Sequence, residues 1–223
     1  MDKDLAREAV AKLMAGVVVT ALLLFVPAGG LGWWNAWLLL GILFVPMALA
    51  GAIMLLRAPD LIRKRLRARE RQEGQRLVIV LSGLMFVVSF ALAGLGARWG
   101  WPTFPRPVCL IAAAAFLAGY ALFGEVLREN EFLSRAVEVQ ESQHVVDTGL
   151  YGIVRHPMYA ATLVMFLSMP VVLGSPLSLA VMLTYLPIIS LRMRGEERML
   201  AEGLEGYGDY LRRVRWRVIP HVW

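Results

Sequence analysis

Six apolar runs separated by more polar stretches constrain this chain more than any other feature. They cover residues 10–26, 33–56, 77–96, 108–127, 158–173 and 177–191. A helix needs roughly 20 apolar residues to cross a bilayer core, and the second, third and fourth runs are long enough. The last two are short, and the turn Gly174-Ser175-Pro176 joins them into a helical hairpin that either crosses or only dips into the bilayer. The predicted fold is an all-α, polytopic membrane helical bundle of about six membrane segments.

The composition excludes several other classes of protein. Hydrophobic residues make up 58% and charged residues 18% of the chain, whereas globular proteins are about 45–50% apolar and about 25% charged. A body of 223 residues has too much surface to hide this surplus. Disordered chains and coiled coils do not fit, and the single cysteine excludes a disulfide-stapled secreted scaffold.

The basic residues predict the orientation in the membrane. All but two of the 23 Lys and Arg residues fall at the termini or in connections on one side of the predicted bundle. The two exceptions are Arg98 and Arg106. The positive-inside rule therefore places both termini in the cytoplasm, and residues 57–76 form a basic cytoplasmic segment. Within it, Ala58–Gln75 is interpreted as an interfacial amphipathic helix that touches anionic headgroups.

Five tryptophans agree with this orientation, because they fall at the outer interface as an aromatic belt would. They are Trp33, Trp34, Trp37, Trp99 and Trp101. The chain is expected in the inner (plasma) membrane of a bacterium or archaeon, in contact with membrane lipids. No nucleic-acid partner is expected, since membrane orientation explains the positive charge. All three histidines and nearly all carboxylates fall on the cytoplasmic side, so an active site is expected to face the cytoplasm.

The first candidate site lies in the segment 149–159, where the chain re-enters the membrane. Pro157 suits the first position of a helix, where its missing N–H costs nothing. Arg155 and His156 then flank a helix N-terminus, whose free N–H groups favour an anion such as a carboxylate. Tyr159 falls on the first turn of that helix. The alternative is a basic residue that anchors an ordinary membrane helix.

A second polar constellation follows the last apolar run. It comprises Arg192, Arg194, Glu196, Glu197, Tyr207, Tyr210, Arg212, Arg213, Arg215, Arg217 and Pro220. Adjacent carboxylates at a membrane edge are costly unless they are paired. Either the arginines pair them in a structural salt-bridge cluster, or the group forms a polar pocket for a zwitterionic ligand. No metal site is expected, because the three histidines are scattered and no HExxH or CxxC motif is present.

Taken together, the two constellations resemble the isoprenylcysteine carboxyl methyltransferase and phospholipid methyltransferase superfamily of integral membrane enzymes. The resemblance covers residues 149–220. It rests on Gly-x-Tyr before Arg-His-Pro-x-Tyr, a membrane hairpin, Glu-Glu, and Tyr-x-x-Tyr ending near Pro220. The chain departs from the family pattern at Ala161, where a glycine is common, and at Leu204-Glu205-Gly206. The resemblance divides the chain into a four-span membrane region, 1–127, and a catalytic region, 128–223.

The resemblance implies that S-adenosylmethionine binds in a cytoplasm-facing pocket while a lipophilic acceptor enters from the bilayer. The expected cofactor-binding residues are Tyr151, Arg155, His156, Pro157, Tyr159, Glu196, Glu197, Tyr207 and Tyr210. Arg155 suits the cofactor carboxylate, the glutamates its ammonium or ribose hydroxyls, and tyrosine rings its sulfonium. The expected catalytic residues are Glu197 and Arg194, which is the candidate for orienting an acidic acceptor.

The acceptor and two other function classes stay open. The acceptor is a prenylcysteine-like carboxylate, another hydrophobic acid or a lipid amine. One alternative function is an NADPH-dependent membrane reductase of the steroid-reductase type, since such proteins have similar C-terminal helices and polar clusters. The other is a non-catalytic membrane scaffold or small transporter. A transporter is disfavoured because no long span carries a charge at its middle.

Overall fold

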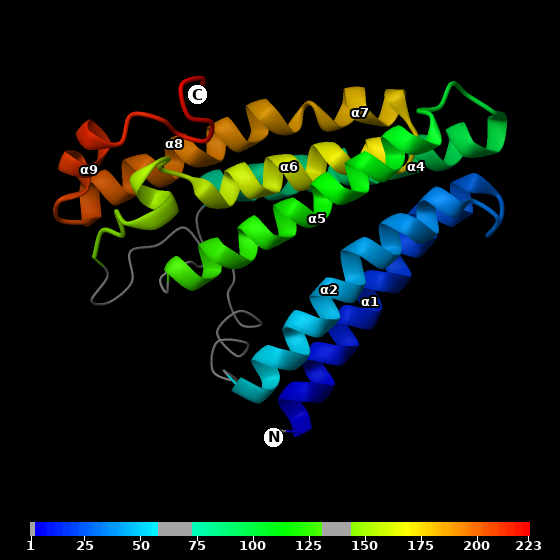
Figure 1. The fold of residues 1–223 in the computed structure, drawn as a ribbon, viewed down its shortest axis with the longest axis horizontal. Helices are drawn as coiled ribbons and strands as arrows, with labels where there is room; N and C mark the ends of the chain where they lie inside the picture. Colours follow the sequence, from blue (N-terminus) through cyan, green and yellow to red (C-terminus); the bar gives the residue numbers. More distant parts are fainter. Residues whose placement is uncertain (1–2, 58–72, 131–143) are drawn as a thin grey trace.

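The computed structural model describes residues 3–57, 73–130 and 144–223, and these form helices without a β-strand (Figure 1). The helices are α1 (Lys3–Ala28), α2 (Trp34–Arg57), α4 (Glu73–Trp99), α5 (Arg106–Glu129), α6 (Pro157–Val172), α7 (Pro176–Met182), α8 (Tyr185–Gly203) and α9 (Tyr207–Arg213), with a 3-10 turn η1 (Gly149–Gly152) before α6. The predicted all-α membrane bundle is confirmed.

Five stretches are long and apolar enough to cross a membrane. They are Asp4–Ala28, Trp34–Arg57, Arg76–Trp99, Arg106–Glu129 and Pro176–Gly203, and α6 is a shorter apolar helix. Consecutive segments run antiparallel, and the α1–α2 pair meets the other helices at one end and diverges from them at the other (Figure 1). The predicted amphipathic helix at 58–75 falls largely outside the described residues.

The last apolar run is divided into two helices, although its hydropathy predicts one segment. The predicted turn is present, since α6 ends at Val172 and α7 begins at Pro176, capped by the Ser175 hydroxyl. α7 then ends at Met182 and α8 begins at Tyr185. Pro187 explains this break: it has no N–H for a helical bond, and its ring clashes in a helix interior but fits a first turn. α8 also continues twelve residues beyond Leu191, to Gly203.

Two glycines allow helices to approach closely. At Gly94 in α4, an added Cβ would lie 2.6 Å from the carbonyl oxygen of Leu24 in α1. At Gly119 in α5, a Cβ would lie 2.7 Å from Met165 in α6. Small residues at such contacts let membrane helices pack by van der Waals contact. The helix pairs α1–α4 and α5–α6 are accordingly in close contact.

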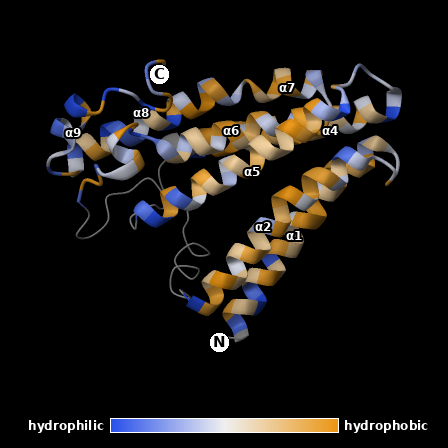
Figure 2. Cartoon of the chain, in the orientation of Figure 1, coloured by the Kyte–Doolittle hydropathy of each residue, from blue (hydrophilic) through white to orange (hydrophobic). Residues whose placement is uncertain are grey.

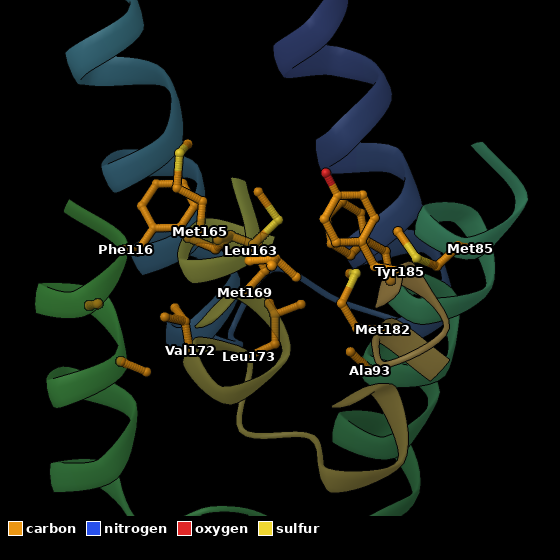
Figure 3. Packing of buried hydrophobic residues seen from close by; sticks show 14 of the residues in the cluster. Met85, Ala93, Phe116, Leu163, Met165, Met169, Val172, Leu173, Met182 and Tyr185 are labelled. Atoms are coloured by element: carbon orange, nitrogen blue, oxygen red, sulfur yellow. The ribbon is translucent and has the colours of Figure 1, made fainter. Parts of the chain in front are cut away.

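The interior between these helices is mostly apolar, and its polar groups are hydrogen-bonded. Figure 3 shows Phe116 of α5, Met182 of α7 and methionines of α4 and α6 packed in one cluster. The Ser89 and Ser178 hydroxyls lie 2.8 Å apart and join α4 to α7. The Asn35 amide donates to the carbonyl oxygen of Val172 at 2.7 Å, which joins α2 to the end of α6. Such bonds remove the cost of polar groups in hydrocarbon.

The two ends of the bundle differ in character. Hydrophilic residues gather at the end formed by α9 and the last turns of α8, whereas the middle of the long helices is hydrophobic (Figure 2). The opposite end holds the α1–α2, α4–α5 and α6–α7 connections and all five tryptophans of the predicted belt. We call it the Trp-rich end. Because α6 has 16 residues, its two ends lie about 24 Å apart.

Candidate functional site

The start of α6 is built as the sequence predicts. Pro157 occupies the first helical turn and His156 is the N-cap residue. The backbone N–H groups of Arg155 and His156 donate to the carbonyl oxygens of Trp216 and Arg217 at 2.9 and 2.8 Å. The C-terminal tail therefore runs beside this segment and fixes the direction in which Arg155 and His156 enter the helix.

Glu197 of α8 joins the two predicted constellations. Its Oε1 lies 3.1 Å from Nε2 of His156 and 3.4 Å from Nε of Arg155. Its Oε2 accepts a hydrogen bond from Nη2 of Arg217 at 2.8 Å. The side chains of Glu197 and Arg155 are only 10% and 12% exposed. Nε of Arg155 is buried and has no hydrogen-bond partner in the described part of the chain.

Glu196 makes a separate contact with α6. The Tyr159 hydroxyl donates to Oε2 of Glu196 at 2.7 Å and accepts from Nε of Arg192 at 3.0 Å. Within the described ranges no hydrogen bond reaches the second Glu196 oxygen, and the residue is half-buried. Glu196 thus keeps one carboxylate oxygen for a further partner, whereas both oxygens of Glu197 are engaged.

The helical period sorts the charged residues of α8 onto different faces. Residues four apart share a face, so Arg192 and Glu196 point together towards Tyr159. Met193 and Glu197 share the buried face. Arg194 is exposed on another face, and among the described residues it contacts none of the groups around Glu197. The structure therefore does not bring Arg194 together with the other predicted site residues.

The three tyrosines that were predicted to bind the cofactor are buried in the elements before α6 and after α8. Tyr151 lies in η1, while Tyr207 and Tyr210 lie in α9, and all three are buried. The Tyr210 hydroxyl donates to the carbonyl oxygen of Tyr151 at 2.8 Å. Burial raises the pKa of Tyr151 to about 12. Burial, reinforced by the nearby charges of Glu197 and Glu196, also raises the pKa of Tyr207, so these phenols stay neutral at physiological pH.

Two residues make contacts at the site that the sequence did not predict. Arg217 was one of several tail arginines without an individual role, yet it is the closest cationic partner of Glu197. Glu129, at the end of α5, accepts a hydrogen bond from the backbone N–H of Leu150 at 2.9 Å and was not predicted at all. Its carboxylate also lies against Gly149, where a Cβ would collide with it. Nothing in the local sequence distinguishes either residue, because both act through contacts distant along the chain.

We define the polar cluster as Arg155, His156, Tyr159, Arg192, Glu196, Glu197 and Arg217. Around Glu197 two guanidinium groups face one carboxylate, which leaves a net positive charge beside the N-terminus of α6. Such an end favours a bound anion. One oxygen of Glu196 remains for a cation or a hydroxyl. The described residues contain no group of three His, Cys, Asp or Glu side chains that could hold a metal ion.

Comparison with known proteins finds a match to a family model and a weaker similarity to a reductase. Residues 108–206 match the family model of the phospholipid methyltransferases, a region that spans α5 to the end of α8. Over 130 residues, 51% of this chain, the sequence is 26% identical to a Delta(14)-sterol reductase from Methylotuvimicrobium alcaliphilum. That alignment covers 30% of the reductase, so the chain spans less than a third of this relative's length. The match to the phospholipid methyltransferase family over residues 108–206 confirms the resemblance predicted from the sequence.

Proposed function

We propose that this protein is an integral membrane methyltransferase that transfers a methyl group from S-adenosylmethionine to a lipophilic acceptor at the cytoplasmic face of the membrane. The observation that carries the proposal is the meeting of the two motifs in the polar cluster. Arg155 and His156 contact Glu197, and Tyr159 bonds to Glu196, although the two segments are about 40 residues apart. The family match over residues 108–206 supports the same activity.

The residues present fit the charges of this cofactor. Nε of Arg155 is buried and faces Glu197 at 3.4 Å, so the other nitrogens of this guanidinium would take the cofactor carboxylate. The free oxygen of Glu196 would accept from the ammonium group or a ribose hydroxyl. Glu197 would not contact the cofactor itself. Both its oxygens are already engaged in holding Arg155, His156 and Arg217 in position. Bound there, the cofactor supplies an electrophilic methyl group on its sulfonium sulfur.

The chain's own contribution would be positioning, exclusion of water and charge. Methyl transfer is an in-line displacement, whose rate depends steeply on alignment of the reacting atoms. The tail bonds to Arg155 and His156 and the Tyr210–Tyr151 bond fix the segment before α6 from two sides. A carboxylate acceptor would need no base, whereas an amine acceptor would first have to lose a proton. Arg194 stays the candidate for orienting an acidic acceptor, from the exposed face of α8.

A second candidate is an NADPH-dependent reductase, and the observation that favours it is the similarity to a Delta(14)-sterol reductase over 130 residues. The two candidates differ in the charge that the site must accept. S-adenosylmethionine carries one carboxylate beside two cationic groups, which suits a cluster containing both arginines and glutamates. NADPH carries several phosphate charges and no cationic group, so the arginines of the cluster would have partners but Glu196 would have no cation to bind.

One experiment distinguishes the two candidates. The purified protein is titrated with S-adenosylmethionine and, separately, with NADPH, and its melting temperature is followed. The proposal expects stabilisation by S-adenosylmethionine alone, because a ligand that binds only the folded state raises its stability. Incubation with labelled S-adenosylmethionine and a lipid extract, followed by mass spectrometry, would then identify the methylated acceptor. Stabilisation by NADPH and not by S-adenosylmethionine would favour the reductase.

A further inference from the structure

A cavity of about 990 Å³ lies at the Trp-rich end, at the opposite end of α6 from the polar cluster. Ligand-binding pockets are typically about 300–1,000 Å³, so this cavity is large enough for a substantial group. Its walls come from the α1–α2, α4–α5 and α6–α7 connections. They include Gly32, Trp34, Asn35, Trp101, Arg106 and Gly174.

Backbone hydrogen bonds hold the walls in place. The N–H of Phe104 donates to the carbonyl oxygen of Gly174 at 3.0 Å, which ties the α4–α5 connection to the α6–α7 turn. The N–H of Trp101 donates to the carbonyl oxygen of Gly96 at 3.0 Å. Asn35, in the cavity lining, is fixed by its bond to the carbonyl oxygen of Val172. The backbone of the α4–α5 connection and the α6–α7 turn, and the Asn35 side chain, are therefore held in place around the cavity.

The charge of this end has one sign. In the connections 29–33, 100–105 and 173–175 and the adjoining helix ends, the charged residues are Arg98 and Arg106, with no carboxylate. The guanidinium carbon of Arg106 lies 5.0 Å from the centre of the Trp34 ring. Arg98 lies beside Gly29 in the α1–α2 turn. Over the described ranges, neither guanidinium is paired with a carboxylate, so both charges are left to attract an anion.

We propose that this cavity binds the headgroup of an anionic phospholipid from the leaflet at the Trp-rich end. The lipid phosphate would lie at the rim beside Arg106, and the glycerol region would occupy the apolar, tryptophan-lined interior. Tryptophans of membrane proteins lie at the depth of the headgroups, where a phospholipid presents a charged phosphate next to less polar groups. On the cytoplasmic or matrix side of membranes, basic pockets between helices bind anionic headgroups, and the same charge attraction would act at the Trp-rich end. A soluble anion would gain only the rim charges and would leave the apolar walls exposed to water.

The test measures lipid binding to the purified full chain in a neutral detergent. Dissociation constants are determined by native mass spectrometry for phosphatidylglycerol and for phosphatidylcholine with the same acyl chains. The melting temperature is followed with inorganic phosphate. The proposal expects saturable binding of phosphatidylglycerol, binding of phosphatidylcholine at least about tenfold weaker, and no stabilisation by phosphate. Because a hydrogen bond to a charged group is lost, Arg106→Gln should weaken phosphatidylglycerol binding by about tenfold or more.

Two control variants make the test specific to the cavity. Lys12→Gln removes a positive charge from α1 far from the cavity and should leave the dissociation constant unchanged. Gly32→Phe should fill the cavity and abolish binding, because Gly32 lines it and a Cβ there has no neighbour within 4 Å. Gly41→Phe adds the same ring to α2 at an equally open position outside the lining, and should bind as the parent does.

Three results would overturn the proposal. They are equal affinity for the two phospholipids, parent-like binding by both Arg106→Gln and Gly32→Phe, or stabilisation by inorganic phosphate that matches the lipid. Melting temperatures of every variant show that the protein is folded before its binding is compared. The outcome is independent of the methyltransferase proposal, because neither Arg106 nor Gly32 touches the polar cluster.

Discussion

Glu197→Gln tests the division of labour between the two adjacent glutamates. The Glu197 side chain is 10% exposed and faces Arg155, His156 and Arg217. Removing one partner of a buried ion pair typically costs about 3–5 kcal/mol, because the remaining charge is left uncompensated. Arg217 is 32% exposed and keeps some contact with water, so we expect the low end, about 3 kcal/mol. For a chain of this length, that loss lowers the melting temperature by about 6–12 °C.

Glu196→Gln should behave differently although it makes the same chemical change one residue earlier. An amide oxygen can still accept from Tyr159, and Glu196 is half-buried, so the melting temperature should fall by no more than about 2 °C. Its loss of charge should appear in binding instead. We expect the dissociation constant for S-adenosylmethionine to rise about ten- to a hundredfold, since a hydrogen bond to a charged group contributes about 1.5–3 kcal/mol.

The assay is a melting curve of the detergent-solubilised protein without ligand, followed by a titration with S-adenosylmethionine. Glu125→Gln is a matched control, because Glu125 forms an exposed ion pair with Arg128 at the end of α5 and should change neither quantity. A parent-like melting temperature for Glu197→Gln together with a large fall for Glu196→Gln would refute the assigned roles. Parent-like affinity for the cofactor in both variants would refute the binding site itself.

Three further predictions concern the frame around the site. Gly149→Ala should reduce the yield of folded protein, measured by size-exclusion chromatography, because Gly149 has φ +53° and a Cβ would collide with Glu129; Gly124→Ala, at an open position in α5, should not. Raising the pH above about 10 should lower the melting temperature, because the pKa of Tyr151 is about 12 in the folded state and about 10 in the unfolded chain. The unfolded chain therefore loses this proton first, and the folded state loses stability relative to it as the pH rises. A melting temperature that stays constant between pH 8 and 11 would contradict this. A reporter fused to the C-terminus should be cytoplasmic, and exposure on the other side would overturn the predicted orientation.

The sequence alone predicted the membrane segments and the start of α6 well. Apolar length and the position of Pro157 are local properties, so they survive folding unchanged. The break at Leu183–Thr184 was missed, although Pro187 marks it, because hydropathy does not register a missing backbone donor. The continuation of α8 was missed for a related reason. Beyond Leu191 the helix leaves the apolar run, and only its period of 3.6 residues shows that Glu197 still faces inward.

The partners within the site were harder to predict than its members. Motif order indicated that Glu196 and Glu197 belong with the start of α6, but it did not indicate which glutamate faces which residue. Tail arginines are equivalent in the sequence, and only packing selects Arg217 as the partner of Glu197. Proximity along the chain favours Arg194 as a site residue, yet the helical period turns it away from the face shared by Met193 and Glu197, and it is exposed.

The backbone bonds from the start of α6 to the tail also impose an order on biosynthesis. Arg155 and His156 bond to residues that leave the ribosome about 60 positions later. At about 5–20 residues per second, their partners follow them by about 3–12 s. During that interval α6, α7 and α8 emerge, so Glu197 becomes available to Arg155 before the tail does. A nascent chain stalled before residue 214 therefore contains the described membrane helices but lacks the tail contacts of the site.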